Sequence, residues 1–170
     1  MTSCDGKKTE MREIHELKSS QEETDTRIVL YALKGAADGY KHVRVRSPDS
    51  DIFFILLHHA KGIPPTLYFD TGSGNNRRLL DITSLAEEYG EEKSEALMCL
   101  HALTGTDTTS AFKGIGKIKP LNVLLKKQDL EKSIHEVGDS WDMESETLCK
   151  LEHFVCSVYG SSKVKSIDDL

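Results

Sequence analysis

Residues 103–116 read LTGTDTTSAFKGIG, and this stretch carries the strongest fold signal in the chain. It follows an apolar run with helical spacing, and it places Asp107 seven positions before a turn that contains Gly114 and Gly116. An acidic residue at a helix end is unfavourable for the helix dipole, so local structure alone does not explain Asp107 well. The backbone N–H groups of the turn would suit a phosphate. Taken alone, however, the glycines are better explained as an ordinary helix–helix turn.

Two further acidic pairs lie upstream, each beside an apolar stretch. Glu23 and Asp25 precede one such stretch, and Asp49 and Asp51 precede residues 52–57, which are apolar throughout. Mg²⁺ prefers carboxylate oxygens, and two-metal phosphodiester chemistry needs several acidic residues that converge from separate elements. Together with Asp107, the two pairs make metal-dependent phosphodiester chemistry the leading hypothesis.

Each acidic pair also has a purely structural explanation. Asp49 and Asp51 follow a predicted strand, and both side chains leave on one face if the chain is still extended there. The segment 47–51 also has good turn and N-cap chemistry, which is the better explanation if the other acidic segments are ignored. Glu23 and Asp25 begin a predicted helix, where acidic residues complement the helix dipole. Residues two apart do not share a helix face, which is a geometric difficulty for a functional pair there.

Hydrophobic patterning predicts an α/β core followed by helices. Helical spacing predicts helices over 21–37, 91–103, 121–125 and 144–159, and a short helix from 83 or 84 to 89. Strands are predicted over 42–46, 66–70 and 77–82, the last two joined as a hairpin by a Gly/Asn-rich turn. Residues 52–57 fit either a buried strand or a helix, because a fully apolar run has no periodicity. Trp141 is expected to cover the core beside the final helix.

Composition indicates one soluble intracellular domain. A length of 170 residues suffices for one core, and the net charge of −6 argues against a protein that coats nucleic acid non-specifically. The four cysteines show no zinc-site spacing, which favours a reducing compartment. The longest apolar run is far short of the roughly 20 residues of a membrane helix, so we expect no membrane partner. The adjacent His58 and His59 are expected at the surface or in a loop, because no ligand partner stands at a suitable spacing.

Taken in order, the motifs resemble the flap endonuclease family, the 5′-nuclease branch of the PIN-like fold. Members of that family have an apolar segment ending in Gly-Ser/Cys-Asp and then Gly-Ile-Gly at the same seven-residue offset, as in residues 103–116. The family's E-x-E at a helix start resembles residues 23–25, and its D-x-D after the next strand resembles residues 49–51. The match is strongest over 77–125 and covers roughly residues 21–127.

The resemblance implies a PIN-like α/β core over residues 21–127, with a parallel-type sheet flanked by helices and a helix-turn-helix that the turn at 114–116 opens. Residues 1–20 are then a disordered lead-in, and residues 128–170 form a helical C-terminal extension. The family also has an N-terminal portion with the first central strand. Nothing in residues 1–21 corresponds to it, so we expect the chain to lack that part, as a fragment or a degenerate copy would.

The resemblance also implies a metal-dependent nuclease, with nuclear or cytoplasmic localisation and DNA as its partner. One or two Mg²⁺ or Mn²⁺ ions would be bound by Glu23, Asp25, Asp49, Asp51 and Asp107. Asp49, Asp51 and Asp107 would be the catalytic residues among them. Phosphates of the duplex backbone would contact Lys113, Gly114, Gly116, Lys117 and Lys119. Two alternatives stay open: a PIN-like module that binds nucleic acid or protein without catalysis, and a small α/β domain whose acidic residues serve turns and caps.

Overall fold

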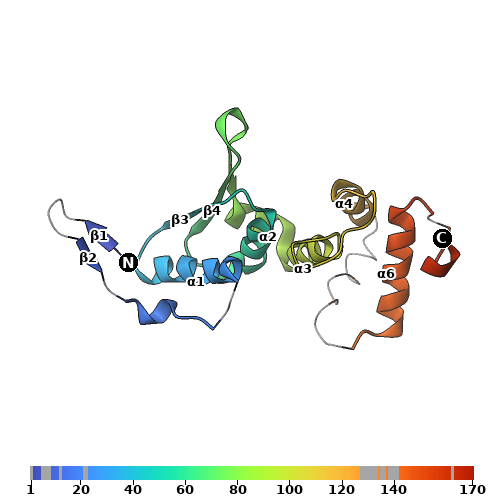
Figure 1. Cartoon of the computed structure of the whole chain (residues 1–170), viewed down its shortest axis with the longest axis horizontal. Helices are drawn as coiled ribbons and strands as arrows, with labels where there is room; N and C mark the ends of the chain where they lie inside the picture. The colour runs from blue at the N-terminus through green and yellow to red at the C-terminus, as the bar shows by residue number, and fades with distance from the viewer. Residues whose placement is uncertain are drawn as a thin grey trace.

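The computed structural model describes residues 2–4, 9–11, 13–20, 23–126, 134, 137, 142–161 and 163–170. Within these residues the chain is mixed α/β, as expected. Figure 1 shows α1 lying along one side of a small sheet, with the β4–β5 hairpin projecting on the other side. Beyond α3, helices α4 and α6 lie toward the C-terminus (Figure 1).

The central sheet has three strands in the order β3-β4-β5. Strand β3 (His42–Arg46) pairs parallel with β4 (Thr66–Thr71), and β4 pairs antiparallel with β5 (Arg78–Asp81). The predicted hairpin is therefore confirmed. The expectation of a parallel-type sheet is correct only for β3 and β4. A short turn can join only antiparallel strands, whereas parallel strands need a crossover such as the helix between β3 and β4.

The helices follow the predicted patterns closely. They are α1 (Thr24–Ala37), α2 (Ser50–His59), α3 (Ile82–Leu103), α4 (Ile118–Leu125) and α6 (Ser145–Val158). The undecided run 52–57 is part of α2, the crossover helix. The predicted break between two helices near residue 90 is also present. Gly90 has φ 77° and ψ 176°, which interrupts the helical backbone inside α3.

One face of the sheet packs on helices and forms the main core. Inward side chains of β3, β4 and β5 meet α1, α2 and the first half of α3, and the most deeply buried members are Ala32, Leu56, Leu57, Leu67 and Ile82. A second core lies where the end of α3 meets α4 and α6, around Leu100, Leu124, Phe154 and Val158. Helix α3 contributes to both cores, so it connects the sheet layer to the C-terminal helices.

The described N-terminal residues, within the predicted lead-in of residues 1–20, contain a short strand pair and a 3₁₀ turn. Strands β1 (Thr2–Cys4) and β2 (Thr9–Met11) pair antiparallel, and a 3₁₀ turn, η1, covers His15–Leu17. Backbone hydrogen bonds form such a pair whatever the polarity of the side chains. Trp141 lies outside the described residues, as does most of 127–141. In the part of the chain that is described, no helix combines the length and apolar character needed to cross a bilayer.

The turn at 114–116 leads into α4, but the residues before it form bends and turns instead of a helix. The helix-turn-helix therefore stays a prediction.

Candidate active site

The predicted acidic residues gather around Asp25. They come from the start of α1, the start of α2 and the loop after α3. Burial raises the pKa of the Asp25 carboxyl, and the charges of Asp49, Asp51, Glu23 and Asp107 raise it further, in that order of size. Segments far apart in sequence thus bring all the predicted metal ligands into one electrostatic neighbourhood.

Asp49 and Asp51 do not leave the same face of an extended chain. Asp49 is the N-cap of α2, and its Oδ1 accepts a hydrogen bond from the backbone N–H of Asp51 at 2.9 Å. The Ser47 hydroxyl in turn accepts the backbone N–H of Asp49 at 3.0 Å. Of the two local geometries that the sequence allows, the turn and N-cap is the one found, because Pro48 and these caps turn the chain into a helix at Ser50.

Glu23 and Asp25 lie at the other helix start in the site. Glu23 is the N-cap residue of α1, yet its side chain makes no capping hydrogen bond, and Asp25 is in the first turn. The N-terminus of α2 also lies at this site, because Asp49 is its N-cap residue. The positive ends of two helix dipoles thus face the same group of carboxylates and offset part of their repulsion.

His101, which the sequence did not suggest as a site residue, is hydrogen-bonded to Asp51. His101 Nε2 lies 2.8 Å from Asp51 Oδ1, and His101 Nδ1 lies 2.8 Å from Lys117 Nζ. Phe54 stacks on the imidazole, with ring centroids 4.1 Å apart. Because the Lys117 ammonium can only donate, Nδ1 accepts and the Nε2–H donates to the carboxylate. This geometry lets His101 fix the orientation of Asp51.

The sequence does contain a signal that His101 makes a buried polar contact. It is 5% exposed and lies on the apolar face of α3 beside Leu97 and Leu100. A buried polar side chain on such a face needs a hydrogen-bond partner, which is a signal for a tertiary contact. The sequence does not reveal which partner, because Asp51 is 50 residues away.

Lys117, predicted to contact phosphate, is engaged within the protein. Besides His101, its ammonium donates to the carbonyl oxygen of Gly105 at 2.5 Å. Burial lowers the pKa of Lys117, and the charge of Asp51 opposes that shift. Lys113, Gly114, Gly116 and Lys119, the other predicted phosphate contacts, are exposed. Lys117 therefore ties the loop before α4 to the end of α3, while its neighbours face solvent.

The loop that carries Asp107 is held by threonines. Thr109 Oγ1 donates to the carbonyl of Ala102 at 2.7 Å and accepts the backbone N–H of Thr106 at 2.9 Å. Gly105 has φ 105°, and a Cβ there would lie 2.7 Å from the Cβ of Ala111. The exposed Asp107 thus projects from a loop of fixed shape. It lies beyond the helix C-cap at Thr104, so the expected clash with the dipole of α3 is reduced.

Carboxylate oxygens are suitable ligands for a hard cation such as Mg²⁺. The carboxylates of this site, however, do not surround a single position. Among the described residues, no group of three or more His, Cys, Asp or Glu side chains is close enough to hold one ion. Mg²⁺ usually retains several waters and uses only one or two carboxylates directly. A hydrated ion held by Asp25, Asp49 or Asp51 fits the residues present, since the group concentrates negative charge at Asp25.

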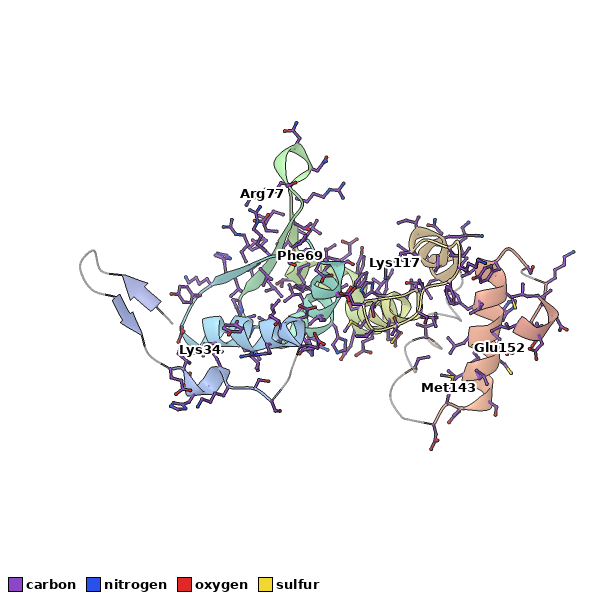
Figure 2. The ribbon with its side chains drawn as sticks, viewed as in Figure 1. Lys34, Phe69, Arg77, Lys117, Met143 and Glu152 are labelled. Atoms are coloured by element: carbon purple, nitrogen blue, oxygen red, sulfur yellow. The ribbon has the colours of Figure 1, made fainter. Side chains whose placement is uncertain are left out.

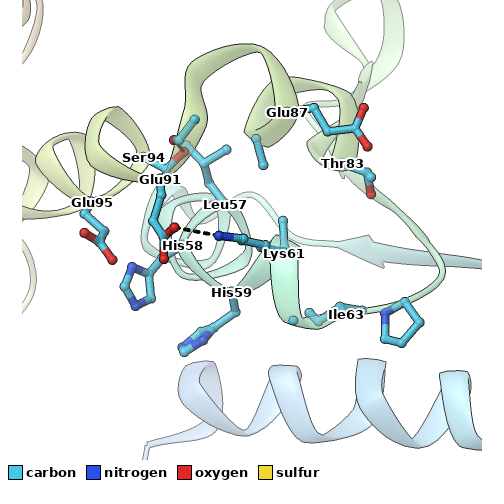
Figure 3. Close-up of a pocket in the computed structure, with 15 residues that line it drawn as sticks. Leu57, His58, His59, Lys61, Ile63, Thr83, Glu87, Glu91, Ser94 and Glu95 are labelled. Carbon is cyan, nitrogen blue, oxygen red and sulfur yellow. Dashed lines mark hydrogen bonds and ion pairs between the residues drawn. The ribbon is translucent and has the colours of Figure 1, made fainter.

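A separate cleft of about 820 Å³, with mixed polar and apolar lining, lies at the opposite end of α2 (Figure 3). It is lined by residues of α2, the turn after it and α3, and an ion pair of 2.6 Å joins Lys61 to Glu91 across it. His58 and His59 are exposed there, as predicted. Burial lowers the pKa of His59, and the neighbouring His58 lowers it further. Within the part of the chain that is described, these histidines do not belong to any group of three or more ligating side chains.

No protein-family model matches this chain, and no curated protein or solved structure matches it. The resemblance to flap endonucleases therefore rests on the motifs alone.

Gly105→Ala is expected to lower the free energy of unfolding by about 2–4 kcal/mol, because the new Cβ meets Ala111 and the backbone is left-handed. Gly39→Ala is the matched control. Gly39 has φ 85° but open space around it, so a loss of about 1 kcal/mol is expected from strain alone. Urea unfolding of both variants measures the difference. Equal losses would show that the loop around Asp107 is not tightly packed.

Asp25→Asn is expected to stabilise the metal-free protein at pH 7. A carboxyl whose pKa is raised by folding costs stability above its folded pKa, and that cost disappears as the pH falls below its unfolded pKa. We expect the melting temperature to rise by roughly 1–3 °C at pH 7. The gain should vanish below about pH 4, where aspartate is protonated in both states.

Asp38→Asn on the same helix is the control for this measurement. Asp38 forms an ion pair with Lys34, so its replacement should leave the melting temperature unchanged or lower it. A fall for Asp25→Asn at pH 7 would mean that the acidic residues do not repel one another.

Proposed function

We propose that this chain is a nuclease-like domain that uses Mg²⁺ or Mn²⁺ to act on phosphodiester bonds of nucleic acid, with DNA as the expected substrate. The observation that supports the proposal is that the charges of Glu23, Asp49, Asp51 and Asp107, from three separate segments, all raise the pKa of Asp25. Carboxylates collected from separate elements are what a hard divalent cation at a phosphodiester requires.

Capping explains only part of this arrangement. Asp49 does cap α2, but the Glu23 side chain makes no capping bond, and Asp107 lies in a loop outside any helix. Like charges held close together destabilise a fold, and proteins tolerate such violations chiefly at functional sites. The third reading, a domain whose acidic residues serve only turns, caps and helix starts, therefore leaves Asp107 unexplained.

In the proposed mechanism Asp49, Asp51 and Asp107, with Glu23 and Asp25, would hold one or two hydrated cations, each with only one or two carboxylates bound directly. When bound, such a cation supplies Lewis acidity to the phosphate and lowers the pKa of a bound water. His101 keeps one oxygen of Asp51 in place through its Nε2–H. The starts of α1 and α2 present a positive dipole end to the negative phosphate. Lys113, Lys119, Gly114 and Gly116 are exposed at the start of α4, where a backbone phosphate could contact them.

A catalytically inactive module that binds nucleic acid or protein is the second candidate. Its support is that no three ligating side chains among the described residues converge closely enough for one ion. The two candidate functions share the same fold. They differ in whether the acidic residues bind a cation and cleave a substrate.

Purified protein is expected to cleave branched or 5′-ended DNA in the presence of Mn²⁺, and Asp49→Asn should abolish that cleavage. Asparagine is as good an N-cap as aspartate, so the variant removes charge while it keeps the start of α2. A loss of roughly 100-fold or more is expected, at the upper end of what disturbed metal sites show. Glu88→Gln, an exposed residue of α3, is the control. No cleavage of branched, 5′-ended or RNA substrates with either metal would favour the inactive module.

His101→Leu should weaken Mn²⁺ binding roughly 10- to 100-fold, because groups that orient metal ligands have effects of that size. Leucine fits the buried site beside Phe54 but cannot donate to Asp51. Titration calorimetry or the electron paramagnetic resonance signal of free Mn²⁺ measures the affinity. His59→Leu, at the far end of α2, should bind as the wild type does. If the two variants bound Mn²⁺ with equal affinity, His101 would have no role in metal binding.

A further inference from the structure

The outer face of the sheet carries a group of arginines that the candidate active site does not use. Side chains alternate along a strand, so Val43 and Val45 face the core while Arg44 and Arg46 face outward. Arg77, just before β5, joins them. Figure 2 places Arg77 on the side of the sheet away from Lys34 of α1. We call Arg44, Arg46 and Arg77 the arginine cluster.

One buried carboxylate gathers the three guanidinium groups. Asp70, opposite Arg46 in the sheet, is 1% exposed. Arg77 binds it with two hydrogen bonds, Nε to Oδ1 at 2.9 Å and Nη2 to Oδ2 at 2.6 Å. The hydrogen bond from Arg77 holds the pKa of Asp70 below its ordinary value, opposed by burial and reinforced by the charges of Arg46 and Arg44. Asp70 is therefore a buried anion that holds the three guanidinium groups near one another.

The cluster keeps a positive excess and available donors. Arg44 Nε and Arg46 Nη1 each lie 3.9 Å from Asp70 Oδ2, which is beyond hydrogen-bond distance. Their side chains are 61% and 60% exposed. Asp81 lies opposite Tyr68 on the same face, so three arginines against two carboxylates leave one net positive charge there, on a chain whose overall charge is −6. The guanidinium fork matches phosphate, so the ligand chemistry that this face fits is a phosphodiester.

An aromatic surface adjoins the arginines. Tyr68 lies directly opposite Arg44 on the same face, is only partly buried, and has its ring centroid 6.1 Å from that of His42. Residues two apart in a strand are about 6.6 Å apart, a spacing of the same order as that of neighbouring phosphates in an extended single strand. Cationic side chains beside exposed rings are the usual combination in sites for single-stranded nucleic acid.

We propose that the arginine cluster, with Tyr68, binds a single-stranded segment of nucleic acid through its phosphates and one stacked base. The proposal rests on the proposed nuclease function and adds a second contact surface to it. Ser47 connects the two sites. Its backbone N–H donates to the carbonyl of Asp70 at 3.1 Å, and its hydroxyl accepts the N–H of Asp49. A strand bound along β3 toward Arg46 therefore runs to the edge of the sheet where the acidic residues begin.

Fluorescence anisotropy of the full chain with labelled oligothymidylate, in EDTA so that no cleavage occurs, tests the proposal. Arg44→Gln and Arg46→Gln are each expected to weaken binding about 3- to 10-fold at low salt. Each should also reduce the slope of log K against log salt by about 0.7, the value for one lost phosphate contact with a single strand. Tyr68→Leu should weaken binding at least 5-fold without a change in that slope.

Arg78→Gln is the matched control. It removes the same charge, but Arg78 pairs with Thr71 and therefore points to the opposite face from the Asp70–Leu79 pair. Arg77 is left unchanged because its loss would leave Asp70 without its hydrogen-bond donor. Circular dichroism of each variant checks that the fold is retained.

The outcomes separate the two proposals. Wild-type binding that Arg44→Gln and Arg46→Gln do not weaken more than Arg78→Gln would overturn the arginine site and leave the nuclease proposal standing. Stronger binding of duplex DNA or of polyglutamate than of oligothymidylate would also overturn it, in favour of a duplex or an acidic protein. Cleavage lost in Asp49→Asn with binding unchanged would support separate binding and catalytic surfaces. A wild type that neither binds nor cleaves any nucleic acid would overturn both proposals.

Discussion

Electrostatic repulsion among the acidic residues beyond the end of β3 is the constraint that the rest of the structure has to accommodate. Burial raises the pKa of Asp25, and the charges of Asp49, Asp51, Glu23 and Asp107 raise it further. The apolar core on the inner face of the sheet fixes α1 and α2 and so prevents these groups from separating. Both helices also begin at the acidic residues, which offsets part of the repulsion. An arrangement that costs stability in the metal-free protein becomes favourable once a cation neutralises it.

Acidic and basic groups occupy different places around the sheet. Acidic groups collect beyond the carboxyl end of β3, where helices α1 and α2 begin, whereas arginines occupy the outer face around Asp70. Ser47 is hydrogen-bonded to both regions. If the chain binds a nucleic acid and a cation as proposed, the arginines would add affinity for the nucleic acid without neutralising the carboxylates.

Local patterns predicted most of the fold because periodicity reports which side chains are buried. The helices of residues 21–125 and the hairpin were predictable in this way, as was the break at Gly90, whose φ of 77° few other residues adopt. The helix at 52–57 was not, because a fully apolar run has no periodicity. The sequence left the geometry of Asp49 and Asp51 open between an extended pair and an N-cap, and the N-cap is the one found. His101 and Asp70 were missed because their partners are set by tertiary packing.

The most direct test of a cation held by the gathered carboxylates is anomalous scattering from crystals soaked in Mn²⁺. The account predicts one or two Mn²⁺ peaks bounded by Asp25, Asp49, Asp51 and Asp107, absent from crystals of Asp49→Asn. A peak only beside His58 and His59, or none at a Mn²⁺ concentration well above that of the protein, would contradict it.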